Sequence, residues 1–279
     1  MIDIFSALGY RLAAFGKAPD TVEVVRRAAV ENPWFLPQEI IRAVKVIRCE
    51  MLERQRLEAW AGAYPPVRTP KRVLVVMAGN IPLVGFFDLL CVLASGHACR
   101  VKPSSKDTVL IGYVVDLLRT IDPAIPLRMA EQGERPDAVI ATGSDNANRY
   151  FRMLFGGIPS LLRGSRQSVA VLSGRETAAE LSGLEEDIFA YSGLGCRNVS
   201  LLFLPRGYMP ELRCTALNEK YRRNYLRERA LLRMRRMPFV DLDGAVLCED
   251  RSFPAALSRI HYTFYDSLAD VEAWLAAHD

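Results

Sequence analysis

Short β-branched runs alternate with apolar helical stretches through the middle of the chain. Three runs have strand character, over residues 72–78, 98–105 and 137–144, and Gly, Pro or Ser lies at the end of each run or directly after it. Helical periodicity follows these runs over residues 85–97, 108–121 and about 146–155. Regular alternation of strand and helix favours a parallel, doubly wound sheet, whose ligands bind at the carboxyl ends of the strands. The pattern predicts an α/β fold with one such unit over residues 69–167.

Further elements flank this unit on both sides. Residues 1–68 are expected to form an N-terminal helical region, with two helices between residues 20 and 64. Asp107 and Thr108 are the expected caps of the helix at residues 108–121. Residues 168–279 predict a second α/β unit with strands at 168–174 and 199–205, a helix at 176–193, an arginine-rich segment, two more strands and a final amphipathic helix.

Length and composition exclude several classes of protein. The chain has 279 residues, 50% of them hydrophobic, which suffices for a substantial core and excludes a disordered chain. The net charge of +4 would suit nucleic acid or a phosphate-rich cofactor, but the 36 basic and 32 acidic residues are interspersed, so charge alone decides little. The expected partner is a small-molecule substrate and not a nucleic acid. The most apolar stretch, residues 73–99, is interrupted by Asn80, Asp88 and His97. A bilayer-spanning helix tolerates such groups badly, so we expect no membrane span.

The N-terminus and the cysteines favour a cytoplasmic protein. No basic residue precedes the apolar part of the N-terminal segment, which carries Asp3 and is therefore unlike an export signal. The six cysteines form no CxxC pair and have no histidine at metal-ligand spacing. We therefore expect reduced thiols, with neither a zinc site nor a disulfide framework.

Cys196 is the first candidate for chemistry. It lies between Gly195 and Arg197 in GLGCRNVS, a turn from a predicted helix to a predicted strand. Such a turn exposes a thiol, and glycine lets a substrate approach the backbone closely. A lone cysteine is more often a small buried hydrophobe, and this alternative stays open at this point.

Polar residues also follow each strand of the first predicted sheet. Asn80 comes after the first strand and suits an amide donor to an oxyanion, although an Asx turn explains it equally well. The ends of the second and third strands carry Lys102, Pro103 and Ser104, and Gly143, Ser144 and Asp145. Small hydroxyl residues and glycine beside one cation suit a phosphate cradle, but ordinary turn chemistry is the commoner origin of each motif.

Taken in order, these motifs resemble the aldehyde dehydrogenase superfamily, and most closely its acyl-CoA reductases, such as the fatty acyl-CoA reductase subunit of bacterial bioluminescence. The similarity covers about residues 73–205 and is most specific in MAGNIPLVGF, the SSKD after Lys102-Pro103, ATGSDNANRYF and GLGCRNVS. It implies a dinucleotide-binding unit over 69–167 and a catalytic unit over 168–279. Relatives of this kind are longer, so the resemblance also implies a C-terminally truncated catalytic unit.

The resemblance also implies roles for individual residues. Cys196 is the implied nucleophile, and Asn80 with the Cys196 backbone N–H is the implied oxyanion hole. The residues implied to hold the cofactor are Lys102, Ser104, Ser105, Gly143 and Ser144. Ser105 stands where many members have a glutamate for the ribose hydroxyls. Without that carboxylate a 2′-phosphate is not repelled, so NADPH is the expected cofactor.

The chain also differs from the superfamily at the position of the general base. Hydrolytic aldehyde dehydrogenases carry a glutamate at about the place of residues 161–165 (LLRGS), where this chain has no carboxylate. An acyl-enzyme would then lack a base to activate water. The expected activity is NADPH-dependent reduction of an acyl-CoA to an aldehyde through an S-acyl-cysteine. A non-catalytic or acyl-carrying subunit of a fatty-acid reductase complex and a hydrolytic aldehyde dehydrogenase remain open alternatives. The expected partners are an acyl-CoA substrate and either further copies of the chain or a fatty-acid reductase complex.

The arginine-rich segment is a separate feature. Seven arginines lie between residues 222 and 236, interleaved with Leu and Tyr. Such a run suits nucleic acid or the phosphates of CoA. The solvated face of a helix is its commoner origin.

Overall fold

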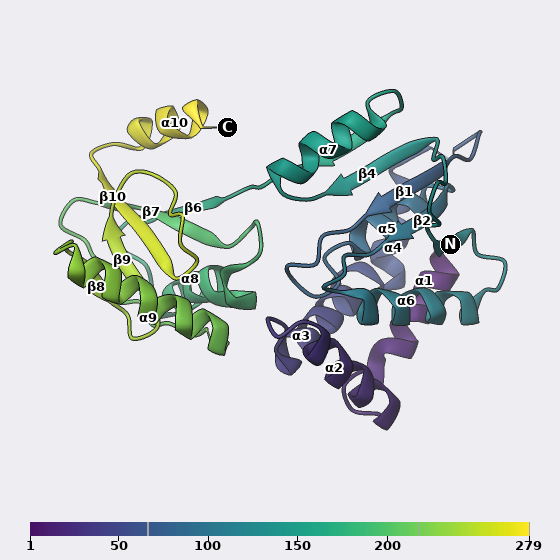
Figure 1. Ribbon diagram of the computed structural model, residues 1–279, viewed down its shortest axis with the longest axis horizontal. Coiled ribbons are helices and arrows are strands. Elements are labelled where there is room, and N and C mark those ends of the chain that lie inside the picture. The colour runs from purple at the N-terminus through teal and green to yellow at the C-terminus, as the bar shows by residue number, and fades with distance from the viewer. Residues whose placement is uncertain (66, 217, 279) are drawn as a thin grey trace. The chain divides into compact units, whose positions relative to one another are not determined.

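The computed structural model describes residues 1–65, 67–216 and 218–278. It divides the chain into two compact units, Met1–Ser165 and Arg166–Asp279 (Figure 1). Each unit contains one five-stranded sheet. No helix among the described residues is long and apolar enough to cross a bilayer.

The sheet of the first unit is entirely parallel. Its strands are β1 (Arg72–Val76), β2 (Ala98–Lys102), β3 (Leu127–Met129), β4 (Ala138–Thr142) and β5 (Ser160–Arg163). Their order is β3-β2-β1-β4-β5, and every neighbouring pair is parallel. The direction of strand addition therefore reverses between β1 and β4, and such a reversal creates a ligand crevice in doubly wound folds. The expected doubly wound α/β fold is confirmed.

Helices connect these strands and precede them. The connections contain α5 (Phe86–Ala94), α6 (Thr108–Ile121) and α7 (Asp145–Phe155). The N-terminal helices are α1 (Ile2–Arg11), α2 (Pro19–Glu31), α3 (Pro37–Val46) and α4 (Arg54–Gly62). Residues 20–64 thus hold three helices where the sequence predicts two, because the backbone is extended at Glu53 and breaks the second. The same apolar core contains Phe5 and Ile40 of these helices and Val75 of the sheet.

The start of α6 differs from the expected cap. Asp107 is the N-cap residue, but its side chain accepts no hydrogen bond from the first turn of α6. Glu31 at the end of α2 takes that role, because its Oε2 accepts the N–H groups of Thr108 at 2.9 Å and Val109 at 3.2 Å. A carboxylate from a distant helix thus satisfies the free N–H groups of α6 and leaves Asp107 for another contact.

The second unit has a mixed sheet. Its strands are β6 (Ser168–Val171), β7 (Val199–Pro205), β8 (Val240–Asp241), β9 (Val246–Glu249) and β10 (Arg259–Tyr265), in the order β6-β7-β10-β9-β8. Only β8 is antiparallel to its neighbour. The helices are α8 (Ala178–Phe189), α9 (Glu219–Met234) and α10 (Leu268–Ala277).

The inner face of α9 packs on this sheet. Tyr225 and Leu232 share a buried cluster with Val246 and Cys248 of β9. Glu228 on the same face is 4% exposed, and its Oε2 lies 2.6 Å from Nη2 of Arg259 on β10. The ion pair therefore ties the arginine-rich helix to the centre of the sheet.

Replacement of Glu228 by alanine should lower the free energy of unfolding of the second unit by about 3 kcal/mol, because Arg259, whose side chain is only 19% exposed, would lose its counter-charge. Glu219→Ala on the same helix is the matched control. Its ion pair with Arg223 is exposed, so stability should change little. Urea denaturation followed by circular dichroism measures both variants, and equal effects of the two would refute a special role for Glu228.

Candidate functional site

The carboxyl edge of the first sheet gathers the predicted cofactor residues. Val76 of β1 pairs in register with Lys102 of β2 and with Ala141 of β4, so these three strands end side by side. The segments that follow them carry the other predicted residues of this unit: Asn80, Ser104, Ser105, Gly143 and Ser144. Cys196 lies in the second unit.

The segments after β1 and β2 approach each other closely. A Cβ atom on Gly79 would lie 2.7 Å from both Cβ and Oγ of Ser104, so only glycine fits at this position. The side chain of Asn32, a buried residue directly after α2, donates to the Gly79 carbonyl at 3.4 Å. Asn80 follows directly and is half-buried. Its position is therefore fixed by a backbone that packs on both sides.

Asp107 joins the same two segments. Its Oδ2 accepts the N–H of Leu83 at 2.8 Å, and Leu83 has a left-handed backbone with φ of +56°. The Asp107 side chain is fully buried, and its Oδ1 has no partner among the described residues. Burial raises the pKa of Asp107 to about 8, although the Leu83 N–H opposes this effect. The carboxyl is therefore largely protonated at neutral pH and holds the segment after β1 in its strained conformation.

The segment after β4 opens α7. Oγ of Ser144 accepts the N–H of Ala147 at 3.3 Å and caps this helix. A Cβ atom on Gly143 would lie 3.0 Å from Cβ of Ala147, so the backbone also turns tightly here. The N-terminus of α7 thus lies at the carboxyl edge of the sheet, where its partial positive charge favours an anion.

Ser104, Ser144 and Lys102 add further donors at this edge, and Asp145 at the start of α7 is an acceptor that already binds the N–H of Ser165 at 3.1 Å. Oγ of Ser104 accepts the N–H of Lys106 at 3.3 Å, so its hydroxyl hydrogen, like that of Ser144, is free to bind a ligand oxygen. Lys102 and Ser105 are exposed, and Lys102 forms no ion pair within the described residues. Two hydroxyls, a cation and a helix N-terminus form a set of donors that fits the phosphates of a dinucleotide.

A cation stands at the end of β5. Nη1 of Arg163 lies 2.6 Å and 2.7 Å from the two carboxylate oxygens of Asp88, in the first turn of α5. Arg163 belongs to residues 161–165, which contain no carboxylate. The end of β5 therefore carries an arginine whose counter-charge, Asp88, lies on α5.

In the second unit, Asn198 shapes the turn that carries Cys196. Its Oδ1 accepts the N–H of Gly195 at 2.7 Å, and its own N–H donates to the Gly195 carbonyl at 3.0 Å. Its Nδ2 donates to the carbonyls of Asp187 at 2.8 Å and Ala190 at 3.1 Å. Two hydrogen bonds between Asn198 and Gly195 therefore close the turn of residues 195–198. Two more attach it to the end of α8, and Cys196 lies within the turn.

The chain reaches this turn through strained backbone. Tyr191, Ser192 and Gly193 have φ angles of 52°, 57° and 66°, which place three successive residues in the left-handed region. Only glycine adopts this region at low cost, so the surrounding packing must hold the other two residues there. Sequence reasoning missed this segment and Asn198. The only local signal was an asparagine two residues after the cysteine, because its partners lie up to 11 residues away.

Cys196 differs from the other cysteines in exposure. All six lie within the described residues, and Cys196 is the only exposed one. Burial raises the pKa of Cys91 to about 11 and that of Cys99 to about 12, and it also raises the pKa values of Cys214 and Cys248. The backbone N–H of Cys196 donates to none of the described residues. The turn therefore presents an accessible thiol together with an available N–H donor.

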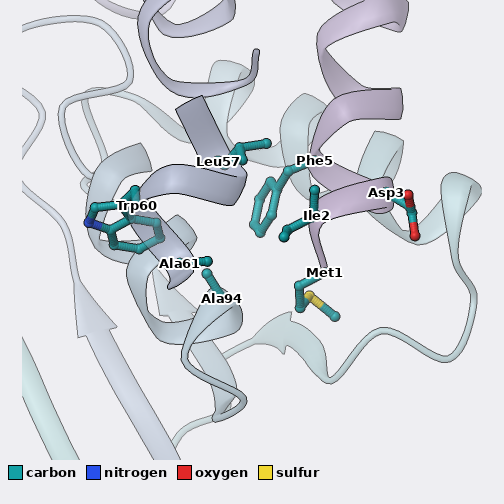
Figure 2. A pocket seen from close by; sticks show the side chains of 8 residues that line it. All are labelled: Met1, Ile2, Asp3, Phe5, Leu57, Trp60, Ala61 and Ala94. Carbon is teal, nitrogen blue, oxygen red and sulfur yellow. The ribbon is translucent and has the colours of Figure 1, made fainter. Parts of the chain in front are cut away.

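An apolar cleft in the first unit contains none of the predicted site residues. A cleft of about 340 Å³ lies among α1, α4 and the end of α5, and its lining is apolar except for Asp3, which pairs with Arg54 (Figure 2). Within residues 1–65, 67–216 and 218–278, no group of three or more His, Cys, Asp or Glu side chains is arranged to hold a metal ion.

Comparison with known proteins relates the chain to aldehyde dehydrogenases through its fold. No protein-family model and no curated protein sequence matches it. A putative aldehyde dehydrogenase from Burkholderia cenocepacia superposes with a TM-score of 0.69 at 14% identity, over 98% of this chain and 71% of that one. An NAD-dependent benzaldehyde dehydrogenase from Corynebacterium glutamicum gives 0.70 at 13% identity, over 100% and 74%.

A third neighbour is betaine aldehyde dehydrogenase from Staphylococcus aureus, which was solved in complex with NAD⁺. Its TM-score is 0.67 at 11% identity, over 98% of this chain and 67% of that one. At such low identity the likeness concerns the fold alone. The chain therefore has the fold of the aldehyde dehydrogenases over about 70% of their length.

Asp107→Asn should remove a pH dependence of stability from the first unit. The pKa of this carboxyl is 3.8 in the unfolded reference and about 8 in the folded protein, so the folded state binds the extra proton between these values. The free energy of unfolding should therefore fall as the pH rises from about 4 to about 8. At pH 9 the asparagine variant should be more stable than the native protein by roughly 3 kcal/mol.

Urea denaturation at pH 5 and pH 9 checks this expectation, with the exposed Asp116→Asn of the same helix as the control. Identical pH profiles of the native protein and Asp107→Asn would contradict a buried, protonated Asp107.

Proposed function

We propose that the protein reduces an acyl-CoA thioester to the aldehyde, with Cys196 as the nucleophile and NADPH as the hydride donor. The observation that carries this proposal is the turn at residues 195–198, which presents the one exposed thiol of the chain beside an available backbone N–H. A thiol and an oxyanion donor in one turn suit acyl transfer. The aldehyde dehydrogenase fold supports oxidoreductase chemistry on an aldehyde or its acyl equivalent.

The first half of the reaction is acyl transfer to the protein. The Cys196 thiolate attacks the carbonyl carbon of the thioester, and negative charge develops on the carbonyl oxygen. The Cys196 N–H stabilises this charge, and in our proposal the Asn80 amide is the second donor. The carbon–sulfur bond to CoA then breaks, the CoA thiolate takes up a proton, and an S-acyl-cysteine remains.

The second half releases the aldehyde. NADPH held by the first unit would supply the hydride for the acyl carbon and would leave as NADP⁺. The same two donors stabilise the oxyanion that forms, and its collapse breaks the bond to the Cys196 sulfur. The products are the aldehyde and the regenerated thiolate.

The first unit would bind the cofactor at the carboxyl edge of its sheet. Lys102, Ser104 and the Gly143-Ser144 turn at the start of α7 provide the donors for its phosphates. Ser105 is exposed and uncharged, so it leaves room for a 2′-phosphate near Lys102. This arrangement supports a preference for NADPH.

The Arg163–Asp88 pair supports reduction over hydrolysis. A base that activates water would have to be a free carboxylate or imidazole near the acyl group. Residues 161–165 offer only Arg163, and its partner Asp88 is held by the ion pair. An acyl-enzyme would therefore persist until hydride or CoA arrives.

Cys196→Ala should abolish the oxidation of NADPH by acyl-CoA, because no other thiol of the chain is exposed. The absorbance of NADPH, followed with acyl-CoA substrates of increasing chain length, measures this directly. Cys49→Ala removes a half-buried thiol and should leave the rate unchanged.

Two other outcomes would overturn the proposal in different ways. Stoichiometric acylation without NADPH oxidation would indicate an acyl-carrying subunit of a fatty-acid reductase complex. Formation of free acid from an aldehyde without CoA would indicate a hydrolytic aldehyde dehydrogenase.

Ser105→Glu should reverse the cofactor preference. The new carboxylate would repel a 2′-phosphate and accept hydrogen bonds from ribose hydroxyls, so the ratio of kcat/KM for NADPH to that for NADH should fall by about tenfold or more. Ser105→Gln keeps the size without the charge and should preserve the preference. An unchanged ratio in Ser105→Glu would show that this residue does not face the adenosine ribose.

A further inference from the structure

The outer face of α9 is a second surface with a distinctive composition. The inner face buries Tyr221, Tyr225, Glu228 and Leu232 against the rest of the second unit, and the opposite side of the helix carries exposed side chains. We call this exposed side and the turn that follows it the α9 outer face. It comprises Arg222, Arg223, Leu226, Arg227, Arg233 and Met234, and the turn from Arg235 to Val240.

The charge of the α9 outer face is almost entirely positive. Glu219 contacts Arg223 at 3.4 Å at the start of the helix, and Asp241, which follows the turn, contacts Arg229 at 2.7 Å. Glu228 is buried and pairs with Arg259. Among the described residues, Arg222, Arg233, Arg235 and Arg236 form no ion pair. These unpaired arginines attract a partner whose surface is negatively charged.

Aliphatic side chains lie exposed among these arginines. Met234 is 81% exposed and Leu226 is 48% exposed, and they are two helical turns apart on the same side of α9. The turn after the helix adds Met237 at 44% and Val240 at 41% exposure. This turn closes with a hydrogen bond from Met237 N–H to the Leu232 carbonyl at 3.0 Å, which folds Met237 back toward the end of the helix.

We propose that the α9 outer face binds the surface of an anionic lipid membrane. Arginines attract the acidic headgroups, and the methionine and leucine side chains can enter the region between headgroups and acyl chains. A nucleic acid partner fits this surface less well. Binding of single strands relies on stacking of bases on aromatic rings, and both tyrosines of α9 are buried, whereas the exposed apolar groups are aliphatic.

Vesicle co-sedimentation of the full chain tests this surface. Vesicles of phosphatidylcholine and phosphatidylserine should bind the protein, and vesicles of phosphatidylcholine alone should not. Added salt should weaken the binding, because screening reduces the attraction of the arginines. Neither result depends on NADPH or acyl-CoA, so this test is independent of the proposed reaction.

Two variants separate the contributions of charge and insertion. Arg222→Gln/Arg233→Gln should lower the affinity for the anionic vesicles by about fivefold for each arginine. Met234→Ser/Met237→Ser should lower it severalfold while the salt dependence remains. Arg27→Gln/Arg119→Gln removes the same charge from exposed positions on α2 and α6 and should have no effect. All of these side chains are exposed, so thermal unfolding should confirm that each variant folds.

Three results would overturn the proposal. The first is no binding of the native protein to the anionic vesicles. The second is an equal loss of binding in the Arg27→Gln/Arg119→Gln control, which would indicate attraction by net charge alone. The third is binding of single-stranded DNA that exceeds binding of the vesicles and is unaffected by Met234→Ser/Met237→Ser, which would indicate a nucleic acid partner.

Discussion

The close contact between the segments that follow β1 and β2 determines the geometry of the first unit's ligand edge. Gly79 can pass Ser104 only because it lacks a Cβ atom, and the buried Asp107 carboxyl holds Leu83 in a left-handed conformation. These contacts fix the backbone on both sides of Asn80. A backbone fixed in this way limits the positions of the Asn80 amide, and the proposed reaction requires such a preorganised donor for its developing charge.

In the second unit, an asparagine side chain fixes the backbone of the turn that carries Cys196. Asn198 bonds to the backbone at Gly195, Asp187 and Ala190, so one residue connects the end of α8 with the turn before β7. The strained backbone at Tyr191 and Ser192 precedes this turn. Strain of this kind persists only where the neighbouring contacts over-determine the conformation, and it concentrates at sites where a reactive group must be presented in one orientation.

The sequence predicted the elements whose signal is local. The β-branched runs of β1, β2, β4 and β7 and the alternating helices were sufficient for the fold class. It missed β3, which has three residues, and β5, whose short run lacks a clear alternation. It named Asp107 and Thr108 as cap candidates for α6; Asp107 is the N-cap residue, but the distant Glu31 carboxylate accepts the N–H groups of the first turn. The placements of Asn198 and of the Arg163–Asp88 pair depend on contacts between separate elements, which no local pattern encodes.

The proposed reaction requires that Cys196 accept an acyl group from CoA. Peptide mass mapping after incubation of the native protein with an acyl-CoA in the absence of NADPH detects this step. We expect one acyl group per chain, attached to Cys196, and its loss as free aldehyde when NADPH is added. An unmodified protein, or acylation at a different cysteine, would contradict it.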